Sequence, residues 1–178
     1  MKFHMRRVDR EIKDQKALQQ LLLNTGYLTL SMADGDEPYA VPLDYVYDEE
    51  ENAVYFHCAR EGKKIEFLKK NPRVWGLVVL NQGFGEGQCV NLYASAMFSG
   101  RVEFIADSAA KLRVLNLFAE KASRDTAGVK QRLQQAAEGD KRVFDSMLLA
   151  RVGVEELTGK RSTEMTVEKL LEATAQKP

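Results

Sequence analysis

The fold of this chain is decided by one stretch of its sequence, His57-Cys58-Ala59-Arg60-Glu61-Gly62-Lys63-Lys64. The stretch follows Ala53-Val54-Tyr55-Phe56, a run of residues that favour β-strands. Beyond it, Ile65 and Leu68 can share one face of a helix, and Pro72 stops that helix. The pattern predicts a strand, a four-residue loop and a short helix, in that order.

Two more strands are predicted before this stretch. Tyr27–Met32 and Tyr39–Tyr47 are rich in β formers, and Asp34-Gly35-Asp36-Glu37-Pro38 between them has the composition of a turn. A second turn, Asp48–Asn52, leads into the strand at Ala53–Cys58. These segments predict a three-stranded antiparallel meander.

Further strands are predicted after the short helix. Val74–Leu80, Asn91–Ala106 and Ser146–Val154 are apolar enough for strands, and Trp75 is expected in the core. Asn81–Gln88 is a glycine-rich loop that lacks the Lys-Ser/Thr ending of a P-loop. About six strands without regular alternation of strand and helix predict an α+β protein, mainly β, built on a closed antiparallel barrel with flanking helices.

The flanking helices are predicted from caps and apolar spacing. Asp14 can cap an N-terminal helix at about residues 14–25, and Asp107 can cap a later one. Val129–Ala136 suggests a further helix, and a C-terminal helix is expected at about residues 164–175. The sequence has no linker-like segment and no internal repeat, so we expect residues 1–178 to form one domain.

The composition is that of a neutral globular protein. Lysine plus arginine and aspartate plus glutamate each number 26, which argues against a nucleic-acid-binding protein. No segment is apolar and long enough to span a membrane, and the N-terminus lacks the apolar core of a secretory signal. Cys58 and Cys89 form no CxxC pair, so we expect no disulfide framework and a cytoplasmic location.

A helix that begins with Lys63 and Lys64 directly after Gly62 can bind a phosphate group. Free backbone N–H groups point out of the helix start, glycine lets a ligand approach closely, and two ammonium groups add positive charge. The same pattern also occurs where the lysines simply face solvent. Both interpretations stay open from spacing alone.

His57 and Cys58 are neighbours in a strand and therefore point to opposite faces. His57 has two interpretations, a hydrogen-bonded residue of the core or a residue of a functional site that supplies protons. Cys58 is expected to be a small buried hydrophobe. Because the two side chains point apart, and because His4 lies in a terminal segment, no metal site is predicted.

Six segments, in order along the chain, match one family. They are Met5–Ile12, Gly35–Tyr45, Tyr55–Lys64, Asn71–Val74, Tyr93–Ser95 with Gly100 behind it, and Leu157–Arg161. On these segments the sequence resembles the pyridoxamine 5′-phosphate oxidase-like FMN-binding split barrels, and within them the nitroimidazole-resistance family. The resemblance implies a six-stranded split β-barrel and a homodimer that holds the flavin between its two subunits.

The resemblance also implies which residues bind the cofactor, FMN. Lys63 and Lys64 would hold its phosphate, with Gly62 against it. The strand Ala40-Val41-Pro42-Leu43-Asp44 would lie beside the isoalloxazine ring. Pro42 has no N–H and leaves a strand locally unpaired, which suits main-chain contact with a flavin but is also typical of an ordinary edge strand or a bulge.

Three further residues are expected near the flavin. In the resembling family the histidine at the position of His57 lies in the flavin cavity, which makes His57 the candidate catalytic residue. Tyr93 and Ser95 occupy alternate positions of one strand and therefore share a face, where they can line the pocket.

Two functions remain open. In the first, FMN passes electrons from NADH or NADPH to a small-molecule substrate such as a nitroaromatic. In the second, the barrel binds a flavin or haem without turnover, with His57 as the axial candidate for haem. Pyridoxamine phosphate oxidation itself is not expected, because the chain has Gly159-Lys160-Arg161-Ser162-Thr163 in place of an Arg-x-His motif near the C-terminus.

Overall fold

The computed structural model of the chain describes residues 5–85, 87, 89–122, 125–139, 144 and 146–175. His4, and Glu86 and Gln88 of the glycine-rich loop, lie outside these ranges. Within them, no helix is both long and apolar enough to cross a membrane.

The strands of the described chain form one antiparallel sheet that closes on itself. They are β1 (Tyr27–Asp34), β2 (Glu37–Asp48), β3 (Ala53–Cys58), β4 (Arg73–Phe84), β5 (Asn91–Phe104), β6 (Leu148–Gly153) and β7 (Glu156–Arg161). Strands β4, β1, β2, β3, β6 and β5 are neighbours in that order, and pairing of β4 with β5 closes a ring of six strands. The predicted six-stranded antiparallel barrel is confirmed, and β7 adds a seventh strand beside β5.

Strand β2 changes its partner partway along its length. Its residues 37–44 pair with β1, and its residues 45–48 pair with β3. Among the described strands, none pairs with the second edge of residues 37–44. An unpaired strand edge presents main-chain N–H and C=O groups. The ring is therefore split here, next to the end of β3.

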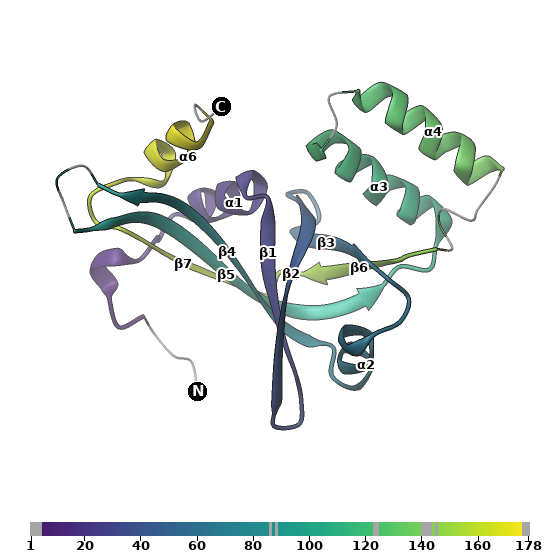
Figure 1. Cartoon of the computed structure of the whole chain (residues 1–178), viewed down its shortest axis with the longest axis horizontal. Helices are drawn as coiled ribbons and strands as arrows, with labels where there is room; N and C mark the ends of the chain where they lie inside the picture. The colour runs from purple at the N-terminus through teal and green to yellow at the C-terminus, as the bar shows by residue number, and fades with distance from the viewer. Residues whose placement is uncertain are drawn as a thin grey trace.

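Helices flank the ring. They are the short 3-10 helix η1 (Val8–Arg10) and the α-helices α1 (Gln15–Asn24), α2 (Lys63–Lys70), α3 (Ser108–Ala122), α4 (Thr126–Glu138) and α6 (Val167–Ala175). Asp14 caps α1, since its side chain accepts a hydrogen bond of 2.9 Å from the N–H of Lys16. Figure 1 shows α1 and α6 over one part of the curved sheet, the α3–α4 hairpin over another, and α2 beside the split.

The barrel has two apolar clusters, one on each side of its wall. Inside the ring, the largest fully buried side chains include Tyr45, Phe56 and Phe98. Outside it, the strand residues that alternate with the inward-facing ones, among them Tyr55, pack under Val114 and the neighbouring residues of α3. Helix α3 thus covers the outward face of β2, β3 and β6. Within the described ranges, no helix covers the outward face of β1, β4 and β5 in the same way.

Three sequence-based expectations need correction. The glycine-rich loop is shorter than predicted, because β4 continues to Phe84 with an irregularity between Asn81 and Gly83. Trp75 is not a core residue, since 39% of it is exposed on the outward face. Strand β7 was not predicted at all, although it occupies the segment Leu157–Arg161 that carries part of the family resemblance.

Candidate functional site

The start of helix α2 is shaped to receive an anion. Gly62 occupies the N-cap with φ of +122°, a conformation that side chains rarely adopt, and a Cβ there would meet open space. The carbonyl of Gly62 accepts from the N–H groups of Ile65 and Glu66, at 2.9 and 3.2 Å. No side chain of the described residues caps the helix, so the earlier N–H groups of Lys63 and Lys64 have no capping acceptor among them. These donors and the helix dipole together favour a negatively charged ligand.

The two lysines lie on different sides of this helix start. The ammonium of Lys63 is 2.6 Å from the carboxylate of Glu37 and stands over the ring of Tyr39, at 4.8 Å from its centroid. Both partners of this ion pair are at least half exposed, so the pair adds little stability. Another anion can therefore replace the carboxylate of Glu37 as the partner of Lys63. The ammonium of Lys64 lies 5.9 Å from the centroid of Phe56, at the end of the barrel interior.

His57 and Cys58 occupy opposite faces at the end of β3. His57 is exposed on the outward face, where its ring meets Phe118 of α3 edge-on, with 5.1 Å between the centroids. The interpretation of His57 as a core residue is therefore wrong. Cys58 is buried, as expected of a small hydrophobe, and burial raises the pKa of its thiol although Lys64 acts to lower it.

The strand segment 41–44 lies on the split edge of β2. Val41 and Leu43 turn inward and are half-buried, whereas Pro42 and Asp44 are exposed on the outward face. Pro42 thus lies in the half of β2 that has a partner strand on one side only. The pairing of β2 with β3 ends at Tyr45 and Phe56. Asp44 directly precedes Tyr45 in β2, and His57 directly follows Phe56 in β3. Asp44 and His57 are therefore the first residues of each strand beyond the point where the strands part.

Tyr93 and Ser95 are also on the outward face, but at some distance from Asp44 and His57. Both are half-buried on β5, and Ser95 pairs with Val79 of β4. Strands β1 and β4 separate β2 from β5, which puts about 14 Å between Asp44 and Ser95 at the usual spacing of strands. In Figure 1 the left-hand ends of β4 and β5 lie on the opposite side of the molecule from α2. One chain does not bring Tyr93 and Ser95 to the lysines.

Large apolar side chains occupy the surface between the split edge of β2 and the pair Tyr93 and Ser95. We call it the open face, and its members are Tyr27 (70% exposed), Trp75 (39%), Val79 (48%) and Met97 (42%). Beside Trp75 a cavity of about 310 Å³ opens, lined by Ser31, Met32, Ala33, Asn71, Arg73, Val74 and Trp75. Exposed apolar side chains grouped in this way are typical of a binding or subunit interface.

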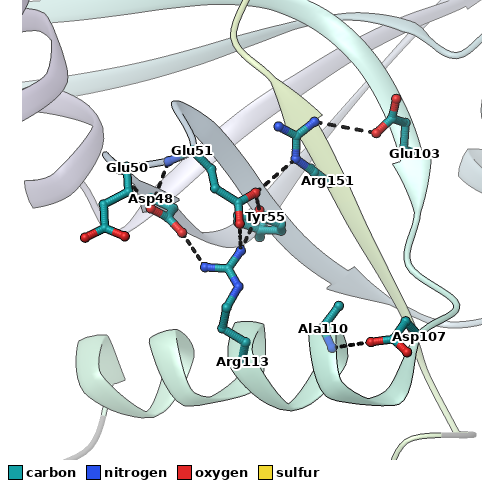
Figure 2. A network of polar contacts seen from close by, with 9 residues as sticks. All are labelled: Asp48, Glu50, Glu51, Tyr55, Glu103, Asp107, Ala110, Arg113 and Arg151. Atoms are coloured by element: carbon teal, nitrogen blue, oxygen red, sulfur yellow. Dashed lines mark hydrogen bonds and ion pairs between the residues drawn. The ribbon is translucent and has the colours of Figure 1, made fainter.

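A polar network on the other outward surface holds α3 in place (Figure 2). Arg113 of α3 pairs with Asp48 and Glu51, each at 2.5 Å, and donates to the hydroxyl of Tyr55 at 2.8 Å. Burial alone would raise the pKa of Asp48, but hydrogen bonds from Arg113 and from backbone N–H groups lower it below its usual value. Arg113, Asp48 and Glu51 each have a partner of opposite charge, so the network is structural. Sequence reasoning did not predict it.

Comparisons with known proteins identify the family and the fold of the chain. Residues 14–161 match the family described as pyridoxamine 5′-phosphate oxidase. No curated protein matches the sequence. A candidate 5-nitroimidazole antibiotic resistance protein from Bacteroides thetaiotaomicron is similar in structure, with 25% identity, a TM-score of 0.68, and coverage of 84% of this chain and 85% of that one.

Two more distant structures share the fold. The flavocytochrome Anf3 from Azotobacter vinelandii has 18% identity and a TM-score of 0.71 over 89% of this chain and 72% of its own. An FAD- and haem-binding protein from Mycobacterium smegmatis has 16% identity and a TM-score of 0.66 over 92% and 80%. At these identities the likeness concerns the fold alone.

Proposed function

This chain belongs to the pyridoxamine 5′-phosphate oxidase family, and on that premise we propose that it binds FMN and acts as an FMN-dependent reductase. The observation that carries the proposal is the start of α2, where uncapped N–H groups, Gly62, Lys63 and Lys64 lie together directly after β3. A phosphate monoester is the ligand that this combination of donors and charge suits best.

The split edge of β2 supports a flavin as the body of that ligand. Its main chain offers donors and acceptors next to Pro42, and a flavin presents both kinds of group along its pyrimidine side. Relatives of the same fold are described as a flavocytochrome and as an FAD- and haem-binding protein. We propose FMN for this chain, because its phosphate ends the molecule and so fits a helix start that has a single cluster of donors.

A homodimer is part of the proposal. The open face presents Tyr27, Val79 and Met97 to solvent, although their burial would be favourable. A second copy related by two-fold symmetry would cover this face with its own. The same symmetry can bring Tyr93 and Ser95 of one subunit to the flavin held by Lys63 and Lys64 of the other, which one chain does not do. The flavin site is then shared by both subunits.

The reaction that we propose is transfer of electrons from NADH or NADPH to a small acceptor such as a nitroaromatic. Bound FMN would supply the hydride chemistry. The chain binds the phosphate at α2, orients the ring along β2 and excludes water at the open face. His57 is exposed at the split, so its imidazole can hand a proton to a reduced acceptor. His57 is our candidate catalytic residue.

One alternative is a flavin- or haem-binding protein without turnover. It is favoured by the haem-binding relative and by the exposed imidazole of His57, which could serve as an axial ligand. We also propose a cytoplasmic location, since Cys58 and Cys89 are both free thiols, as a reducing compartment permits.

A visible spectrum of the purified full-length protein tests this function. We expect flavin bands, which bleach when NADH is added and return when a nitroimidazole is supplied. A Soret band would favour the haem alternative. Flavin bands that do not respond to NADH or NADPH would contradict the reductase function while leaving flavin binding intact.

A further inference from the structure

The N-terminal segment runs beside β7, at the end of the barrel where Tyr93 lies. Glu11 forms an isolated antiparallel bridge with Lys160, and the N–H of Ile12 donates to the carbonyl of Gly159 at 3.0 Å. The N–H of Ser162 donates to the carbonyl of Tyr93 at 2.9 Å. This register places the segment around Arg10 next to the end of β7, and the end of β7 next to Tyr93.

Positive charge collects at this place. We call it the basic corner, and its basic side chains are Arg7, Arg10, Lys160 and Arg161. Nearby acidic residues are Asp9, Glu11 and Glu164. The corner therefore has an excess of one positive charge in a chain whose formal net charge is zero. Arg7 forms an ion pair with Asp9 at 2.5 Å, so the excess rests on the other three basic residues.

Two buried donors of the corner lack an acceptor. Among the described residues, four buried side-chain atoms have no hydrogen-bond partner, and Arg10 Nε and Ser162 Oγ are two of them. Ser162 is only 1% exposed. Arg161 uses Nη1 for the carbonyls of Ser162 and Met165, at 2.9 and 3.0 Å. A buried donor without an acceptor is costly, and a bound anion would remove that cost.

We propose that the basic corner binds a phosphate group of a dinucleotide. The group is the 2′-phosphate or the diphosphate of the nicotinamide donor. Arginine suits phosphate because its planar donors match the phosphate oxygens in pairs. The inference rests on the proposed function, since it gives the nucleotide of that reaction a place to bind, with Tyr93 between the corner and the open face.

Isothermal titration of the full-length protein tests this site. The variants are Arg10→Gln and the exposed Lys160→Gln, and the control is Arg132→Gln, which removes one exposed positive charge on α4. The probes are sodium pyrophosphate, NADPH, NADH, FAD and FMN. For pyrophosphate we expect Arg10→Gln to weaken binding about tenfold or more, because a charge-assisted hydrogen bond is lost. Lys160→Gln should weaken it less, and Arg132→Gln should leave it unchanged.

The probes separate the phosphates of the donor. A loss in Arg10→Gln for NADPH and not for NADH assigns the corner to the 2′-phosphate, and a loss for both assigns it to the donor's diphosphate. A loss for FAD and for neither NADH nor NADPH would contradict the assignment to the donor. Equal binding of all probes by Arg10→Gln and the unaltered protein would overturn the inference. Pyrophosphate needs no flavin, so this result stands apart from FMN affinity, on which the proposed function depends.

Discussion

The ammonium of Lys63 lies 2.6 Å from the carboxylate of Glu37, across the split between β2 and the start of α2. A phosphate bound at the helix start would compete with this carboxylate for the same lysine. We therefore expect Glu37→Gln to tighten FMN binding about two- to fivefold, the range that an exposed ion pair spans. Fluorescence titration of FMN at low salt measures the effect.

Glu120→Gln is the matched control for this variant. Glu120 of α3 forms an exposed ion pair with Lys130 of α4, away from α2, so its loss should not change FMN affinity. Weaker FMN binding in Glu37→Gln would mean that Glu37 orients Lys63 for the ligand and does not compete with it.

A charge placed on the open face should separate the subunits. Val79 is 48% exposed between Tyr27 and Ser95, so Val79→Asp would bury a carboxylate in the proposed interface. We expect a monomer by size-exclusion chromatography with light scattering, together with at least a tenfold loss of FMN affinity, because the site is shared. Ala127→Asp, at an exposed position of α4, should remain dimeric. A Val79→Asp dimer with normal FMN binding would rule out this face as the interface.

His57 should affect turnover and not cofactor binding. It is exposed and makes an edge contact with Phe118, so His57→Gln keeps the local packing while removing the proton carrier. We expect the kcat for the acceptor to fall about 100-fold, with FMN affinity changed less than threefold. His57→Phe should lower the kcat by a similar factor and should also leave FMN affinity nearly unchanged. Unchanged kcat in both variants would show that protons reach the acceptor from water or another residue.

The network around Arg113 should make stability depend on pH. Arg113 and backbone N–H groups hold the pKa of Asp48 below 3.8 although burial acts to raise it. Because the folded-state pKa is the lower one, the unfolded chain binds more protons in acid. The stabilisation is therefore fully present above pH 3.8 and is lost as the pH falls through the lowered pKa.

Urea unfolding between pH 2 and 7 measures this effect. Asp48 is 9% exposed, and we expect Asp48→Asn to lower the free energy of unfolding by about 1–2 kcal/mol at pH 7 and to flatten its dependence on pH below 4. Glu103→Gln, in which an exposed residue 3.5 Å from Arg151 is changed, should have little effect. An Asp48→Asn curve parallel to that of the unaltered protein would contradict the role of Asp48.

The barrel could be predicted from the sequence because its signals are local. The meander β1–β2–β3 has turn residues between runs of β formers, and α1 has Asp14 as its cap. Strand β7 has no such signal. Its Gly159 packs so closely that a Cβ would come within 2.4 Å of Leu18 and of the carbonyl of Ser95. Contact with the rest of the fold, and not strand propensity, selects the conformation there.

The two groups of residues in the candidate site also differ in how well the sequence predicts where they lie. Gly62, Lys63 and Lys64 are consecutive, so a sequence pattern suffices to group them. The distance of Tyr93 from them depends on the order of four strands, which spacing along the chain does not reveal. The exposure of Trp75 was missed because Val74–Leu80 is apolar on both faces, and such a run is typical of a strand buried on both sides.

FMN titration of Lys63→Ala with Lys64→Ala tests the binding of FMN at α2 most directly. We expect the double variant to bind FMN at least 100-fold more weakly than the unaltered protein, since two charged donors to the phosphate are lost. The control is Lys69→Ala, which removes an exposed lysine from the other end of the helix and should change the affinity less than threefold. Equal FMN affinity in the double variant and the unaltered protein would contradict the account and place the phosphate elsewhere.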